Sequence, residues 1–179
     1  MPRASSWPKT APELIFVVDS GALFNMKRAG VVKVDEQWPM FSRMSEMVRT
    51  GEIAFPRHVA NEMIRAQHPD TPGTWAAGSK DSILYPDPTD DAMAEVQSVA
   101  QLTDPAGEAE YEPADPYVVA MAFEIAERYP DGEVIVVSDD YVDRMPRKES
   151  VQTACDRLGL ECRRSVDFAE HMRSVLGEG

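Results

Sequence analysis

Short, fully apolar runs separated by stretches with helical periodicity dominate the chain. The run at 14–18 is continuous and ends in Asp19, which is typical of a buried parallel strand that meets a turn, and residues 134–138 repeat this profile. Shorter runs at 53–55 and 161–163 predict two further strands. Strands that alternate with helices indicate right-handed crossovers and a mainly parallel sheet covered on both faces, so the predicted fold class is α/β.

The helices between these strands are predicted from apolar spacing and from end signals. An apolar stripe that begins at Trp38 predicts a helix stopped by Gly51, and Pro56 suits the first turn of the next helix. Asp115 followed by a proline predicts the N-cap and first position of the clearest helix in the sequence. The expected helices cover about 38–48, 56–66, 90–102, 115–129, 151–158 and 168–176.

The domain organisation is simple. A chain of 179 residues is long enough for one buried core and short for two independent ones. Residues 1–12 are polar and proline-rich, so we expect a loose leader there, followed by a single domain over 13–179. Within it, prolines interrupt the pattern at 67–113, which predicts an irregular inserted region with one helix.

Composition narrows the classes of partner. Lys and Arg number 18 against 31 Asp and Glu, a net charge of -13, which argues against a broad nucleic-acid clamp but not against an enzyme that meets phosphates through metal ions. The apolar runs are far shorter than the roughly 18 residues that span a bilayer, and no apolar signal core begins the chain. We therefore expect a cytoplasmic protein with no membrane partner.

Candidate chemistry lies at the carboxyl ends of the predicted strands, where open α/β sheets bind their ligands. Asp19 ends the first long strand, Asp139 and Asp140 follow the second, and Asp115 begins the helix expected beside it. Glu62 lies in the first half of its helix and can lean back toward the helix start. Four carboxylates are therefore expected to meet at one edge of the sheet.

Carboxylates gathered in one cleft repel one another unless a cation is present. Mg²⁺ or Mn²⁺ accepts carboxylate and water ligands and lowers the pKa of a bound water, so phosphodiester hydrolysis is the implied chemistry. Each acid also has a structural interpretation, with Asp115 as a helix cap and Glu62 on a solvated helix face. Asp19 is hard to solvate after five apolar residues, which favours a functional role for it.

Other phosphate chemistries do not match the spacing. Asp19 is not followed two residues later by a second aspartate, which a haloacid dehalogenase requires. The Asp139 and Asp140 pair follows a late strand, unlike the paired acids of a response-regulator receiver. Neither GxGxxG nor GxxxxGK[ST] is present in the sequence. A small-phosphate hydrolase on a similar sheet and a non-catalytic binding module both remain open as alternatives.

Taken together, the acids and their flanking residues resemble a known family. The resemblance rests on the stretches 16–20, 55–62, 114–122, 136–140 and 148–162, in that order. They are similar to the PIN-domain nucleases, and among these to the VapC-like toxins of bacterial toxin-antitoxin pairs. The resemblance implies a small parallel sheet flanked by helices, an acidic metal pocket, and Mg²⁺- or Mn²⁺-dependent cleavage of RNA.

The resemblance also implies roles for individual residues. Asp19, Glu62 and Asp115 take the places of metal-coordinating acids, and Ser20 that of a neighbour which donates a hydrogen bond. The fourth acid of the family falls in a Thr-x-Asp pattern, which here reads Ser138-Asp139-Asp140 and leaves two candidates. A homodimer and a co-encoded antitoxin are the protein partners that the resemblance implies.

Local geometry favours one of the two aspartates. Side chains alternate along an extended segment, so Ser138 and Asp140 should project to one side and Asp139 to the other. This predicts Asp140 as the metal ligand and Asp139 as a turn cap or a holder of the metal's water. Arg144, Arg147 and Lys148 follow on the same loop and are expected to contact the RNA backbone.

Overall fold

The computed structural model describes residues 6–65, 70–107 and 112–177. Within them a four-stranded sheet has the order β2-β1-β3-β4, and each neighbouring pair is parallel. The strands are β1 (Leu14–Val18), β2 (Ile53–Ala54), β3 (Glu133–Val137) and β4 (Glu161–Arg163). Val18 pairs with Val137, so β1 and β3 end level with each other. The predicted α/β class and parallel sheet are confirmed.

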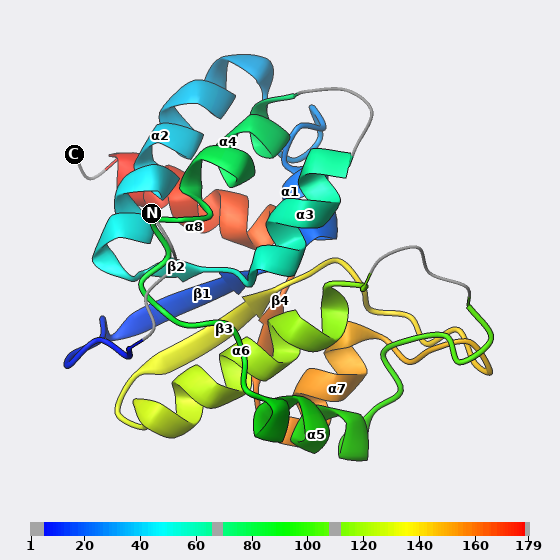
Figure 1. Cartoon of the computed structure of the whole chain (residues 1–179). Coiled ribbons are helices and arrows are strands. Elements are labelled where there is room, and N and C mark those ends of the chain that lie inside the picture. The colour runs from blue at the N-terminus through cyan, green and yellow to red at the C-terminus, as the bar shows by residue number, and fades with distance from the viewer. Residues whose placement is uncertain (1–5, 66–69, 108–111, 178–179) are drawn as a thin grey trace.

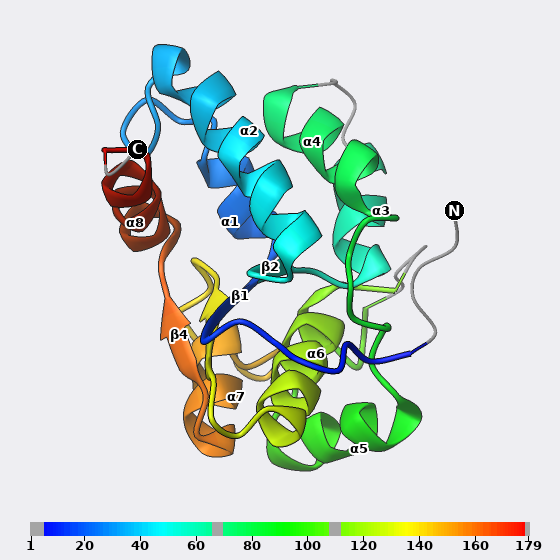
Figure 2. The same ribbon diagram turned by 90° about the vertical axis from the view of Figure 1, so that its left-hand side faces the viewer.

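Helices cover both faces of this sheet, as the parallel strands require. The helices α1, α2, α3, α4 and α8 form one layer, and α5, α6 and α7 form the other (Figure 1). The side view in Figure 2 shows the sheet between these two layers. Their bounds are α1 (Ser20–Asn25), α2 (Val34–Thr50), α3 (Arg57–Arg65), α4 (Thr71–Ser79), α5 (Asp90–Val99), α6 (Asp115–Arg128), α7 (Val151–Leu158) and α8 (Ser165–Gly177).

The central strands are apolar along their whole length because they are buried on both faces. Ile15, Val17 and Val18 have no exposed surface, and Phe16 is 1% exposed. The ring of Phe16 contacts that of Phe168 on α8 edge-on, with 5.0 Å between centroids. Fully burying a side chain of this size contributes about 1.5–3 kcal/mol, so the central strands stabilise the sheet that carries the site.

The described part of the expected leader is not loose. The ring of Trp7 lies 6.2 Å from the rings of both Tyr85 and Tyr129, and the guanidinium of Arg128 stands 5.3 Å from it. The hydroxyl of Tyr129 donates a hydrogen bond of 2.5 Å to the carbonyl of Pro8. Aromatic packing therefore fixes residues 6–12 to the domain. The polar, proline-rich composition of this segment does not predict such a contact. Residues 1–5 lie outside the described residues.

The region at 67–113 is more regular than the prolines suggest. It contains the expected helix α5 and also α4, which the sequence did not predict because its nine residues include two glycines. Asp70 caps α4 by accepting a 2.9 Å hydrogen bond from the backbone nitrogen of Gly73. Trp75 packs against Phe41 and Phe55, so tertiary burial compensates for weak helix propensity. Residues 67–69 and 108–111 of this region lie outside the described residues.

The helix expected from Trp38 begins earlier, at Val34, and Trp38 is not part of its buried face. Its exposed fraction is 78%, whereas Met40, Phe41 and Met44 are buried. At 3.6 residues per turn Trp38 lies roughly 120° around the axis from Met44, which directs it to solvent. The unpredicted helix α1 has only six residues, too few for a periodic pattern. No described helix combines the length and apolar character of a membrane-spanning segment.

Candidate metal centre

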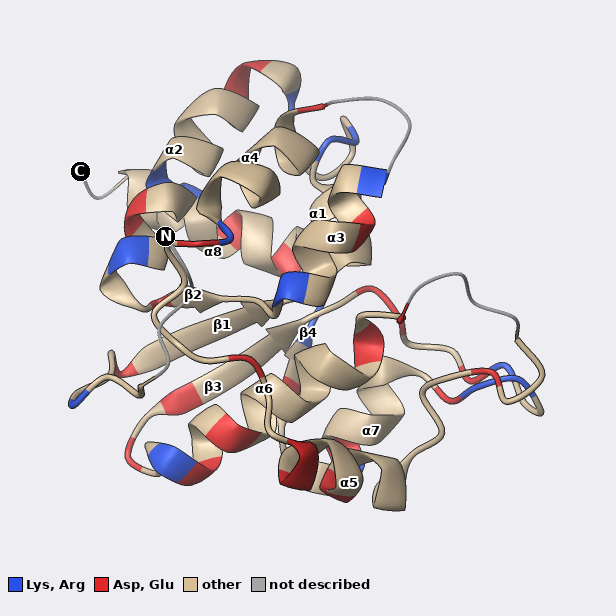
Figure 3. Cartoon of the chain, in the orientation of Figure 1, with Lys and Arg blue, Asp and Glu red and all other residues tan. Residues whose placement is uncertain are grey.

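The four predicted acids come from four segments that converge beyond the ends of β1 and β3. Asp19 directly follows β1, and Asp140 lies three residues after the end of β3. Glu62 is on α3 and Asp115 is the first residue of α6. Acidic residues on α3 and α6 and the mixed charges of the loop after β3 are visible in Figure 3. The crossover topology brings these distant segments to one edge.

Asp19 is the most buried of the acids, with 4% of its surface exposed. Its Oδ2 accepts a 2.7 Å hydrogen bond from Ser138 Oγ, and its Oδ1 accepts one of 3.2 Å from the backbone nitrogen of Gly21. Burial, followed by the negative charge of Asp115, nevertheless raises the pKa of Asp19 from 3.8 to about 7. These hydrogen bonds do not offset the cost of burial, and among the described residues no Lys or Arg side chain forms an ion pair with Asp19.

Glu62 joins α3 to the start of α6. Its Oε1 accepts a 2.7 Å hydrogen bond from the backbone nitrogen of Ala114, and its Oε2 accepts one from Ser20 Oγ. Ser20 Oγ also lies 3.3 Å from Asp19 Oδ1. A hydroxyl has one proton, so Ser20 serves one of these carboxylates at a time. The alternative of Glu62 on a solvated helix face does not describe this arrangement.

Asp115 and Asp140 share a cation from the chain itself. Lys148 Nζ lies 2.5 Å from Asp115 Oδ2 and 3.2 Å from Asp140 Oδ2. Arg144 approaches Asp140 Oδ1 from the outside at 3.6 Å. The prediction that Asp115 is the N-cap is wrong by one position, since Ala114 occupies the cap and Asp115 the first turn. An acid in the first turn still benefits from the helix dipole.

Asp139 points away from this group, as the alternation of side chains predicts. Its Oδ1 accepts a 2.9 Å hydrogen bond from the backbone nitrogen of Ser165, and its Oδ2 accepts bonds from Ser165 Oγ and Asn25 Nδ2 at 2.6 and 2.5 Å. Ser138 is fully buried on the other side, where its Oγ accepts a 3.1 Å bond from the backbone nitrogen of Asp140. Asp139 thus ties α1 and α8 to the end of β3.

Comparison with protein families shows to which family the chain belongs. The family described as "Domain of unknown function (DUF4411)" matches residues 16–176. The chain belongs to the DUF4411 family. The matched range includes Asp19, Glu62, Asp115 and Asp140, so the whole acidic group lies inside the family domain. Among curated proteins and among solved structures, no match to this DUF4411 chain was found.

The donor chemistry of this DUF4411 domain fits a hard divalent cation. The acids and serines of the group offer oxygen atoms only, and Asp140 Oδ1 is buried without a hydrogen-bond donor. In the described part of the chain no three His, Cys, Asp or Glu side chains already stand close enough to hold an ion. Mg²⁺ characteristically uses one or two carboxylates, several waters and substrate phosphate instead of a closed protein cage. Asp19, Glu62, Asp115 and Asp140 are the residues that would hold it.

Sequence reasoning missed two features of the site. Lys148 was expected on the RNA-facing surface, but its side chain is 23% exposed and inserts between two acids. The second feature is His58 on α3, whose side chain is 14% exposed and stacks on Tyr117 with 3.5 Å between ring centroids. Both His58 Nε2 and the Tyr117 hydroxyl contact Glu112, at 3.1 and 2.9 Å. No spacing in the sequence connects these residues, so only the tertiary structure could place them.

Proposed function

We propose that this DUF4411 chain is a PIN-like, Mg²⁺- or Mn²⁺-dependent endoribonuclease. The observation that carries the proposal is the buried carboxylate of Asp19 at the end of β1, held by Ser138 and set close to the charges of Asp115 and Glu62. An uncompensated buried acid beside others is costly, so its presence at a ligand-binding sheet edge favours a cation site. The toxin of a toxin-antitoxin pair is the proposed biological role.

The residues of the chain prepare the site in three ways. Ser138 fixes the orientation of Asp19 and is itself fixed by the backbone nitrogen of Asp140. Ser20 and the backbone nitrogen of Ala114, the N-cap of α6, hold Glu62 toward the same edge. A bound divalent ion would supply the lowered water pKa and the neutralisation of charge on the phosphate that hydrolysis needs. In this proposal the acids bind the ion, and the serines orient the acid side chains.

Mixed RNA tests this function directly. We expect the protein to cleave single-stranded RNA with Mg²⁺ or Mn²⁺ and to lose all cleavage when EDTA removes the ion, because the acids alone repel phosphate. A generic phosphomonoester assayed beside the RNA tests the alternative of a small-phosphate hydrolase. Cleavage that persists in EDTA would contradict the metal mechanism, and hydrolysis of the phosphomonoester alone would contradict the choice of substrate.

One observation favours a second candidate, a non-catalytic PIN-like binding module. Lys148 already compensates part of the charge of Asp115 and Asp140, so the pocket is not wholly dependent on an external ion. A folded protein that binds RNA but cleaves none with Mg²⁺, Mn²⁺ or other divalent ions would support this alternative. Co-expression with the product of the adjacent gene tests the proposed antitoxin, and the mass of the pure protein in solution tests the proposed homodimer.

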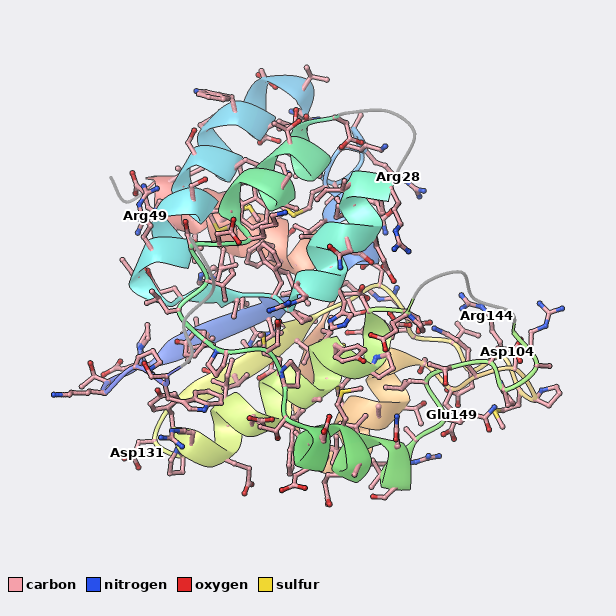
Figure 4. All side chains as sticks on the ribbon, in the orientation of Figure 1. Arg28, Arg49, Asp104, Asp131, Arg144 and Glu149 are labelled. Carbon is pink, nitrogen blue, oxygen red and sulfur yellow. The ribbon has the colours of Figure 1, made fainter. Side chains whose placement is uncertain are left out.

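The loop after β3 is the proposed contact for the RNA backbone. Arg144 and Arg147 are both exposed on it, and Arg144 lies beyond the sheet edge in Figure 4. For single strands each lost phosphate contact lowers the slope of log K against log salt by about 0.7, so Arg144→Gln with Arg147→Gln should lower it by about 1.4. Fluorescence anisotropy at several salt concentrations in an Asp19→Asn background measures binding without cleavage.

The matched control replaces two arginines on α2, Arg43→Gln with Arg49→Gln. Arg49 lies on α2, on the other side of the molecule from Arg144 in Figure 4, so the salt slope of this variant should equal that of the parent. Equal slopes for the loop variant and the parent would remove the loop from the RNA-binding surface. Equal losses in both double variants would instead point to a general effect of net charge.

A further inference from the structure

Lys148 stands where a cation would be expected in the acidic group. Its ammonium bridges Asp115 on α6 and Asp140 on the loop after β3, at 2.5 and 3.2 Å. The side chain of Lys148 is 23% exposed, so the ammonium sits largely inside the acidic group. Lysine is an ammonium with three donors, so it places one positive charge between the two acids.

The loop that carries Lys148 is held on both sides of the residue. Arg144 and Lys148 exchange backbone hydrogen bonds of 2.8 and 3.2 Å, which close the loop. The Gln101 side chain donates to the carbonyls of Pro146 and Arg147 at 3.0 and 2.8 Å. These contacts attach the loop to the segment after α5, so the backbone at Lys148 is fixed independently of the acids.

The next residue strengthens the same attachment. The backbone nitrogen of Glu149 donates a 2.7 Å hydrogen bond to the Gln101 carbonyl. The backbone nitrogen of Gln101 in turn donates one of 2.9 Å to Glu149 Oε2. Arg157 on α7 holds both carboxylate oxygens of Glu149, at 2.9 and 2.7 Å. A lysine on a fixed backbone, with its stem largely buried, loses less freedom when it bridges two acids than a lysine on a free loop.

The charges divide the site into two halves. Lys148 takes one oxygen of Asp115 and one of Asp140, whereas among the described residues no Lys or Arg forms an ion pair with Asp19, which accepts hydrogen bonds from Ser138 Oγ and the backbone nitrogen of Gly21. The half around Asp19 and Glu62 therefore needs an external cation, and the half between Asp115 and Asp140 already has one. Lys148 contacts only one oxygen of each of these two acids, so their second oxygens are not taken by the ammonium. Two divalent ions would have to displace an ammonium that is held within 2.5 Å of Asp115.

We propose that the Lys148 ammonium is a built-in cation of the acidic site, so that the site takes a single divalent ion beside Asp19 and presents Lys148 to the RNA phosphate as its second positive charge. This inference rests on the proposed function. Nucleases that hold two ions use them to stabilise both the attacking and the leaving oxygen. Here the ammonium, a compact charge with three donors, takes one of these two places.

Counting bound ions tests the inference. Metal-free protein is titrated with Mn²⁺ at neutral pH, with the stoichiometry read by calorimetry and by the electron paramagnetic resonance signal of free Mn²⁺. We expect one ion in the parent and two in Lys148→Met, because the freed oxygens of Asp115 and Asp140 then lack a cation. Lys148→Gln, which is neutral but still donates hydrogen bonds, should also take two ions, so that the test stands if the methionine variant does not fold.

Matched variants show whether the number of bound ions depends on a positive charge at position 148 itself or on any positive charge in this loop. Arg147→Met removes an exposed cation from the same loop and should leave one ion, as should Lys148→Arg, which keeps the charge in place. Asp19→Asn should lower the affinity for the first ion by about tenfold or more. These variants also report whether the loop tolerates substitution at all.

The outcomes distinguish the inference from the proposed function. Two ions in the parent, or one ion in both Lys148→Met and Lys148→Gln, would overturn the inference and leave the metal-dependent nuclease intact. Loss of ion binding in both neutral variants would also overturn it, since Lys148 would then position the acids instead of replacing an ion. No Asp19-dependent ion in the parent or any variant would refute the proposed function itself.

Discussion

Asp140→Asn is expected to lower metal-dependent RNA cleavage by about a hundredfold or more without unfolding the protein, since even residues behind metal ligands cost about 10–100-fold. Asp140 Oδ1 is buried without a donor, so neutralising this side chain removes charge from the site and no structural hydrogen bond at that atom. Its other oxygen accepts a 3.2 Å bond from the backbone nitrogen of Val151, which an asparagine carbonyl can also accept. Single-turnover cleavage at saturating Mn²⁺ and thermal unfolding measure the two effects.

Asp139→Asn provides the matched control one residue away, and we expect the opposite phenotype. The carboxylate of Asp139 accepts hydrogen bonds from Ser165 N, Ser165 Oγ and Asn25 Nδ2. An asparagine side chain has only one acceptor oxygen, so at least one of these donors would face its amide nitrogen and lose its hydrogen bond. The expected loss of folding stability is about 1–3 kcal/mol. For a chain of this length Tm falls by roughly 2–4 °C per kcal/mol, while cleavage well below Tm is kept. Inactive Asp139→Asn beside active Asp140→Asn would show that Asp139 is the ligand.

Asp19→Asn is expected to abolish cleavage and to remove the loss of stability that ionised Asp19 causes at high pH in metal-free protein. The folded pKa of Asp19 is about 7, above its ordinary 3.8, so between these values the folded state holds a proton that the unfolded state has released. This group therefore costs nothing below about pH 4, lowers stability as pH rises, and exerts its full cost above about pH 7. Asparagine never ionises, so Asp19→Asn should melt higher than the parent at pH 8 and equally at pH 4.

Added Mn²⁺ should reverse this ranking. An ion that binds only the folded site stabilises by RT ln(1 + [L]/Kd), about 2.7 kcal/mol at a hundred times Kd, and it removes the cost of ionised Asp19. The parent should gain in Tm at pH 8 and Asp19→Asn should not. The control is Asp131→Asn, an exposed acid at the other end of the sheet (Figure 4), whose metal response should equal that of the parent. An equal metal-induced rise in Tm for Asp19→Asn and the parent would mean that the ion binds elsewhere.

The principal elements of the fold were accessible from sequence because their signals are local. The continuous apolar runs predicted β1 and β3, since a strand buried on both faces needs no polar alternation. The helix α6 was found from its proline and its apolar stripe, although its cap is Ala114 instead of Asp115. By contrast α4 was missed, since its stability comes from the burial of Trp75 and not from its own residues.

The sequence by itself determined which acids reach the sheet edge, because parallel topology sends the carboxyl end of each strand to one side and alternation separates Asp139 from Asp140. Only the tertiary structure decided what each acid contacts there. Asp139 meets Ser165 and Asn25, and Lys148 enters the site instead of facing solvent. Side-chain contacts between segments far apart in the chain depend on how loops and helices pack, and no period or spacing along the sequence encodes that packing.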